Sequence, residues 1–93
     1  MTIQALLQVI QKARDEAKAI LGALEQTGHP QTNESSGLYL ALVTVQKRLA
    51  GRRPGSPLGE FATELEQLSA LCTGKLEPVK PLLDEALRIA RGS

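Results

Sequence analysis

The first quarter of the chain carries its most regular pattern of hydrophobic and polar positions. Between Thr2 and Gln26 the apolar residues follow one another at spacings of three and four, as Ile3, Leu6, Ile10, Ala13, Ala17, Ile20 and Leu24. This spacing places them along one face of an α-helix. Gly28 can adopt a left-handed cap and Pro30 cannot continue a helix, so the helix should stop near Thr27. The pattern predicts a first helix of about 25 residues, roughly 38 Å long.

Two further stretches repeat this spacing and predict a second and a third helix. Their apolar faces are formed by Leu38, Leu42, Val45 and Leu49, and by Leu58, Phe61, Leu65, Leu68 and Cys72. Gly51 is the expected end of the second helix. Ser56 and Pro57 have the residue types of an N-cap and a first helical position, so we expect the third helix to begin there. We expect it to continue through Cys72 and to end at Gly74.

The last stretch predicts a fourth helix whose start is less clear. Pro78 and Pro81 both lie near it, and proline is tolerated only in a first turn, so the helix should run from one of them to Arg91. Helices joined by short loops pack antiparallel to their neighbours. The sequence therefore predicts an all-α fold, an antiparallel up-down-up-down four-helix bundle with a long first helix, in a single domain of residues 1–93.

Composition supports helices over strands. Apolar residues make up 42% of the chain and are mainly Leu and Ala, while Tyr39 and Phe61 are its only aromatic residues. Leu and Ala favour helices, whereas strands favour β-branched and aromatic residues.

The first helix has more apolar surface than one neighbouring helix would cover. Leu7, Val9 and Leu21 widen its apolar face, and its predicted length exceeds that of the other helices, which would expose an apolar end around Leu24. Exposed apolar patches often mark interfaces, so these four residues are candidate partner-binding residues. Two alternatives remain open: Gly22 ends the helix early, or the following connection folds back over the end.

A narrow waist in the same helix leaves a second question open. Ala13 and Ala17 are small, and small residues either leave room for a large side chain or let another helix approach closely. The favoured filling is Tyr39 or Phe61 of the same chain, and the alternative is a helix of a partner.

Charge changes the picture at one end of the bundle. The formal net charge is only +1, which gives no overall attraction to nucleic acid or membrane. The predicted topology nevertheless gathers cations at the end where the first helix begins, namely Lys47, Arg48, Arg52, Arg53, Arg88 and Arg91. We expect only Glu60 to oppose them. Cations complement the C-terminal dipoles of the second and fourth helices, but this does not explain Arg52 and Arg53, which lie in a predicted loop. Lys47, Arg48, Arg52 and Arg53 are therefore candidate residues for binding an acidic protein or phosphates.

Residues that could carry chemistry are few. One histidine and one cysteine are too few for a zinc site, and no phosphate-binding loop is present. Cys72 and His29 could in principle act as nucleophile and base. However, Cys72 lies on the apolar face near a helix C-terminus, whose partial negative charge disfavours a thiolate. We favour a core cysteine beside a loop histidine, and predict no catalytic residue, no metal site and no cofactor.

No motif in the sequence is specific enough to name an activity. We expect a small non-enzymatic protein–protein interaction module, such as an adaptor, a chaperone or an inhibitor or immunity-type binder, with another protein as its partner. A second copy of the chain, bound through the first helix, is one candidate for that partner. The alternative, less favoured, is a nucleic-acid-associated regulator that uses the basic end. Gln and charged residues interrupt the N-terminal apolar positions, so we expect neither a signal peptide nor a membrane span, and a cytoplasmic location.

Overall fold

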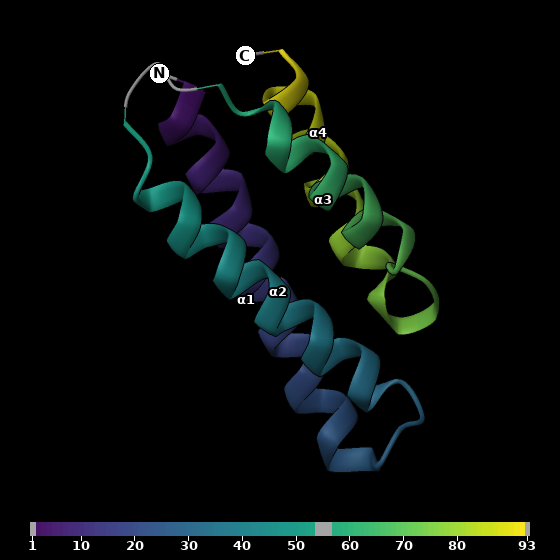
Figure 1. Cartoon of the computed structure of the whole chain (residues 1–93). Coiled ribbons are helices and arrows are strands. Elements are labelled where there is room, and N and C mark those ends of the chain that lie inside the picture. Colours follow the sequence, from purple (N-terminus) through teal and green to yellow (C-terminus); the bar gives the residue numbers. More distant parts are fainter. Residues whose placement is uncertain (1, 54–56, 93) are drawn as a thin grey trace.

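Four α-helices run alternately up and down, as predicted (Figure 1). The structure is a computed structural model that describes residues 2–53 and 57–92. Its helices are α1 (Thr2–Thr27), α2 (Thr32–Ala50), α3 (Gly59–Ala70) and α4 (Lys80–Arg91), and a 3₁₀ helix, η1 (Gly74–Val79), leads into α4. The predicted all-α four-helix bundle with a long first helix is confirmed.

The apolar faces found in the sequence meet in one core. α1 packs against α2 and α4, and α3 packs against α4, while α2 and α3 have few contacts with each other. The largest side chains that are fully buried include Leu6 and Ile10 of α1, Leu42 of α2, Phe61 of α3 and Leu83 of α4. Removing these side chains from water is the main favourable contribution to folding.

The end of α1 confirms the predicted left-handed cap. Gly28 has a φ of +63°, its N–H donates to the carbonyl of Glu25 at 3.4 Å, and the N–H of His29 donates to the carbonyl of Leu24 at 3.1 Å. This pair of bonds is the Schellman arrangement, which satisfies carbonyls that the helix itself leaves free. Gly22 lies within the continuous helix, so the alternative of an early end at that residue is wrong.

The predicted overhang of the first helix is present, but α1 does not extend alone. α1 has 26 residues and α2 has 19, whereas α3 and α4 have 12 each. Figure 1 shows the α1–α2 end extending beyond the turn between α3 and η1. α2 accompanies α1 there, and η1 also packs against α1. Leu24 is consequently only 5% exposed, so the expected bare apolar end around this residue does not exist.

The third helix differs from the prediction at both ends. It begins at Gly59, so Pro57 precedes it and is not its first helical residue, while Ser56 lies outside the described residues. It ends at Ala70, and Cys72 therefore belongs to the turn that follows. The expected continuation to Gly74 was wrong.

A contact from the opposite pair of helices explains where this turn goes. The side-chain amide of Gln31, just before α2, donates from Nε2 to the carbonyl of Thr73 and accepts from the N–H of Lys75 at Oε1, both at 2.9 Å. Between them Gly74 has a φ of +58°, and a Cβ there would lie 2.6 Å from Gln31 Oε1. We refer to Gln31 and residues 73–75 as the Gln31 clamp. It fastens the α1–α2 connection to the α3–η1 turn.

The start of the fourth helix agrees with the prediction. α4 begins at Lys80, so Pro81 lies in its first turn, where the missing N–H breaks no helical hydrogen bond. Pro78 lies one element earlier, inside η1.

Candidate functional site

A groove of about 680 Å³ lies between α1 and α2. Gln8, Lys12, Lys47 and Ala50 are exposed, so the groove is open to solvent. Its floor is mainly carbon, and the half-buried Leu7 contributes to it. The groove is lined by Leu7, Gln8, Gln11, Lys12, Arg14, Gln46, Lys47 and Ala50, and we call it the α1–α2 groove.

Hydrogen bonds between side chains organise one wall of this groove. Arg14 donates from a guanidinium nitrogen to Gln46 Oε1 at 2.6 Å, and Gln46 Nε2 donates to Gln11 Oε1 at 2.5 Å. Gln11 in turn donates to Asp15 at 2.9 Å. The guanidinium also lies over the ring of Tyr39, 6.0 Å from its centroid. These contacts tie α1 to α2 and hold Arg14 in one place.

The groove is basic. Three of its lining residues, Lys12, Arg14 and Lys47, are cations, and none of its lining residues is a carboxylate. In the part of the chain that the structure describes, none of the three makes an ion pair, and Arg14 Nε is buried without a hydrogen-bond partner. The three cations of this groove therefore have no ion-pair partner in the described chain, and Asp15, which accepts a hydrogen bond from Gln11, is a carboxylate beside them.

The four apolar candidates of the first helix have different positions. Val9 is 6% exposed and Leu24 is 5% exposed, so the chain's own side chains cover both. Leu7 and Leu21 are half-buried, and of these only Leu7 lines the groove. The structure therefore does not bring the four together on one surface.

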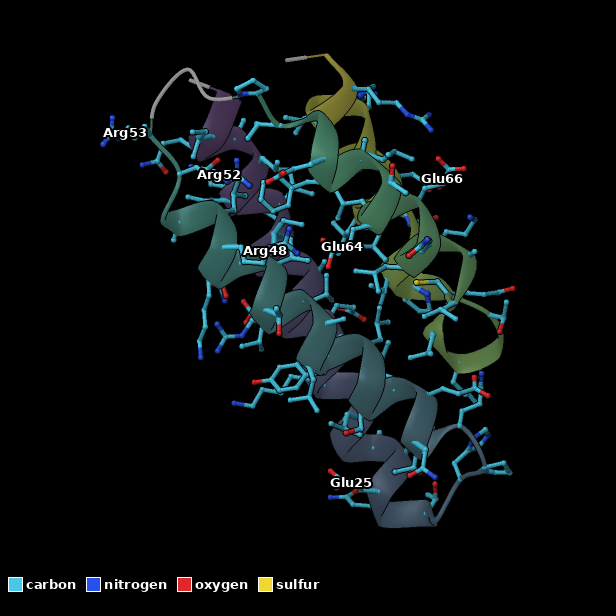
Figure 2. All side chains as sticks on the ribbon, in the orientation of Figure 1. Glu25, Arg48, Arg52, Arg53, Glu64 and Glu66 are labelled. Carbon is cyan, nitrogen blue, oxygen red and sulfur yellow. The ribbon has the colours of Figure 1, made fainter. Side chains whose placement is uncertain are left out.

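The four basic candidates also lie in different environments and do not form one surface. Lys47 lines the groove and Arg53 is exposed. Arg48 and Arg52 are instead used within the bundle, because Arg48 pairs with Glu64 at 2.7 Å and Arg52 pairs with Glu60. In Figure 2 Arg48 lies on the side of α2 that faces Glu64, whereas Arg53 points away from the helices.

The expectation that only Glu60 opposes the basic end is thus wrong. Glu64 and Glu66 also take part, since Glu66 pairs with Arg91 at 2.8 Å. The reason is the rotation of α3, which directs Glu64 toward α2 and Glu66 toward α4 (Figure 2). Glu60, at the start of α3, pairs with Arg52 of the loop after α2. Counting charges along the sequence does not reveal this rotation.

Phe61 shows why these two arginines belong to the fold. It is fully buried, and the guanidinium carbons of Arg48 and Arg52 each lie 5.2 Å from its ring centroid. The two arginines therefore cover Phe61 and pair with glutamates of α3, which joins α2 and the loop after it to α3, an element with which α2 has few other contacts. The waist at Ala13 and Ala17 is likewise fully covered by the chain, which leaves no open space there for a partner's helix.

Cys72 and His29 do not form a reactive pair. Cys72 is 3% exposed and its thiol donates to the carbonyl of Leu68 at 3.4 Å. Burial raises the pKa of this thiol to about 11, with a further increase from the charge of Asp84 and an opposing effect from Lys80. His29 is engaged elsewhere, because its Nδ1 accepts the N–H of Gln31 at 3.0 Å.

Ser69, Lys80 and Asp84 form the other polar cluster of note. The Ser69 hydroxyl donates to Asp84 at 2.6 Å and accepts from the Lys80 ammonium at 3.1 Å. The hydroxyl proton is thus directed to a carboxylate that also lies 3.9 Å from the ammonium group. With Ser69 only 5% exposed, this cluster joins α3 to α4 and presents no accessible nucleophile.

Neither a metal-ligand cluster nor a membrane-spanning helix is found in residues 2–53 and 57–92. No three His, Cys, Asp or Glu side chains converge there as metal ligands would. Among the helices that are described, none combines the length and apolarity that crossing a membrane requires.

Comparisons with protein-family models, with curated proteins and with solved structures found no match. The function is therefore inferred from the geometry and chemistry of this chain alone.

Proposed function

We propose that this chain is a small non-enzymatic module that binds another protein in the α1–α2 groove. The observation that supports this most directly is the groove itself, which combines a half-buried Leu7 with unpaired cations. Concave sites that place a few polar groups around an apolar floor are typical of ligand and peptide binding. An adaptor, a chaperone or an inhibitory binder would each use such a surface, and a cytoplasmic location suits a chain with one unpaired cysteine.

A different protein is favoured over a second copy of the chain as the occupant. A two-fold symmetric dimer uses the same patch on both subunits. Across this groove it would bring Lys12, Arg14 and Lys47 of one copy close to the same cations of the other, and like charges in an interface are unfavourable.

Nucleic acid is less favoured than it was on the sequence alone. Arg48 and Arg52 were two of the four cations assigned to it, and both are committed to glutamates and to Phe61. Phosphate binding draws on unpaired Lys and Arg side chains, and fewer of these remain at the basic end.

The test fills the groove and compares the proteins that remain bound. Ala50 lines the groove and is the last residue of α2, so Ala50→Tyr places a bulky ring in the groove. Ala70 is the matched control, because it is also exposed and is the last residue of α3, a helix that does not line the groove. Each variant is used as bait in quantitative co-purification from the source cell.

We expect partners that are retained by the unmodified chain and by Ala70→Tyr and are lost from Ala50→Tyr. Melting curves of the two variants should agree with each other, which separates blocking from misfolding. Partners that bind Ala50→Tyr as well as the unmodified chain, or no partner at all, would contradict the proposal.

A further inference from the structure

The cations of the α1–α2 groove differ from several other cations of this chain in having no ion-pair partner in the described residues. Arg48, Arg52 and Arg91 each pair with a glutamate of α3, and Lys80 lies near Asp84. Lys12, Arg14 and Lys47 line a single groove and make no ion pair in the described part of the chain. The groove therefore offers three positive charges to whatever occupies it.

Arg14 is held in place by neutral groups. Gln46 accepts its guanidinium N–H and Tyr39 lies beneath it, so neither contact cancels its charge. The carboxylate of this network, Asp15, accepts a hydrogen bond from the amide of Gln11 and makes no ion pair with Arg14. A guanidinium that is already ordered loses little further freedom when it binds a carboxylate, which favours binding.

The shape of the groove adds a second requirement. Leu7 and Ala50 contribute an apolar floor, so the occupant needs apolar side chains as well as negative charge. The groove runs along α1 from Leu7 to Arg14, which corresponds to two helical turns, or about 10 Å. An amphipathic helix presents apolar residues at positions i and i+3 or i+4 over this distance, with charged residues beside them.

We propose that the α1–α2 groove binds an acidic amphipathic helix of the partner protein. Its apolar side chains lie on Leu7 and Ala50, and its Asp and Glu side chains pair with Lys12, Arg14 and Lys47. This specificity rests on the proposed function, because it assumes that the groove is the docking site. A protein helix fits better than a nucleic acid, since the floor is apolar and no aromatic residue lines the groove to stack on a base.

The experiment selects ligands from a displayed library of helical peptides of about 14 residues, roughly 20 Å long, with the full chain as bait. The enriched peptides are then measured by fluorescence anisotropy against three proteins: the unmodified chain, the double variant Lys12→Gln with Lys47→Gln, and the double variant Lys18→Gln with Lys75→Gln. The last is the matched control, because it removes the same charge from exposed lysines outside the groove.

We expect the selected peptides to carry Asp or Glu beside apolar pairs spaced by three or four residues. Their affinity should fall about fivefold in the Lys12/Lys47 variant, the combined effect of two lost exposed ion pairs, and should be unchanged in the control. Binding should also weaken as salt rises from about 50 to about 300 mM, since salt screens exposed charges.

Several outcomes would overturn this inference. They are an absence of enriched peptides, selected peptides without acidic residues, equal affinity for the Lys12/Lys47 variant, and a single-stranded oligonucleotide that displaces every peptide. The Ala50→Tyr variant distinguishes a failure of the docking site from a failure of its preference for acidic helices. If peptides fail to bind Ala50→Tyr but bind the Lys12/Lys47 variant with unchanged affinity, the groove is the docking site and has no preference for acidic helices. If peptides bind Ala50→Tyr with unchanged affinity, both the docking site and its preference for acidic helices are refuted.

Discussion

The Gln31 clamp gives a sharp test of how the two helix pairs are joined. Gly74 has a left-handed backbone, and a methyl group placed there would lie 2.6 Å from Gln31 Oε1. Gly74→Ala should therefore have two costs. A left-handed backbone costs a residue with a Cβ about 1–2 kcal/mol. Displacing Gln31 breaks its hydrogen bonds to residues 73 and 75, which contribute about 1 kcal/mol each at most, because both are exposed.

The two costs separate when Gln31 is removed first. Gln31→Ala should lower the free energy of unfolding by about 1–2 kcal/mol, because both hydrogen bonds are lost. In that background Gly74→Ala meets no clash and retains only its backbone cost. The double variant should then be about as stable as Gly74→Ala alone, which corresponds to a coupling of about 1–2 kcal/mol. The effect of Gly→Ala on the unfolded chain is the same in both backgrounds and cancels.

Urea unfolding followed by far-ultraviolet circular dichroism measures all four proteins of this cycle. Gln26→Ala is the control substitution, because the side chain of Gln26 is exposed and makes no hydrogen bond in the described structure. Combined with Gly74→Ala it should be additive. If Gln31→Ala and Gly74→Ala were also additive, to within about 0.5 kcal/mol, the clamp would not be what positions the α3–η1 turn.

Two further predictions concern Cys72 and the ion pairs of Arg48 and Arg52. Cys72 should react with an alkylating reagent at pH 8 about two orders of magnitude more slowly in the folded chain than in urea, because burial raises its pKa to about 11. Because the folded pKa lies above the ordinary value of 9.0, the stability contributed by the neutral thiol is intact below pH 9 and is lost as the pH rises toward 11. Equal alkylation rates in the folded chain and in urea would contradict the raised pKa. Replacing Glu60 and Glu64 together by Gln should lower the free energy of unfolding by about 1 kcal/mol or less, because the ion pairs with Arg48 and Arg52 are partly exposed. The arginines that lose their glutamate partners should increase oligonucleotide binding at low salt. If the unmodified chain binds the oligonucleotide equally well, the glutamates do not keep these arginines from phosphates.

Local patterns were sufficient to predict most of the helices. The spacing from Ile3 to Leu24 predicted α1, and Gly28 with Pro30 predicted its end to within a residue. Each of these signals acts through neighbours along the chain, by helical periodicity or by the backbone freedom of glycine. The start of α4 near Pro81 followed from the same kind of reasoning.

The end of α3 could not be read in this way. Leu68 and Cys72 continue the helical spacing, yet the helix ends at Ala70 and the turn is held by Gln31, about 40 residues earlier in the chain. A contact between distant segments overrides the local pattern here. The residues around Gln31 in the sequence form no pattern that would predict this contact.

The candidate site was predicted only in part, for a similar reason. Leu7 and Lys47 were chosen and do line the groove, but Arg14, Gln11 and Gln46 were missed. One signal was available, because Arg14 lies beside the apolar face of α1, where a charge needs neighbours that can accept its hydrogen bonds. Which neighbours accept them depends on the register of α2 against α1, and this register is a property of the fold.

Amide chemical-shift mapping of the isotope-labelled chain tests the central claim most directly, with a recovered partner or the tightest selected peptide added in increasing amounts. The proposed docking site predicts that the largest shifts fall on residues 7–14 of α1 and 46–50 of α2, and that they disappear in Ala50→Tyr. Shifts confined to α3 and α4, or to the end of the bundle around Arg53 and Arg88, would contradict it.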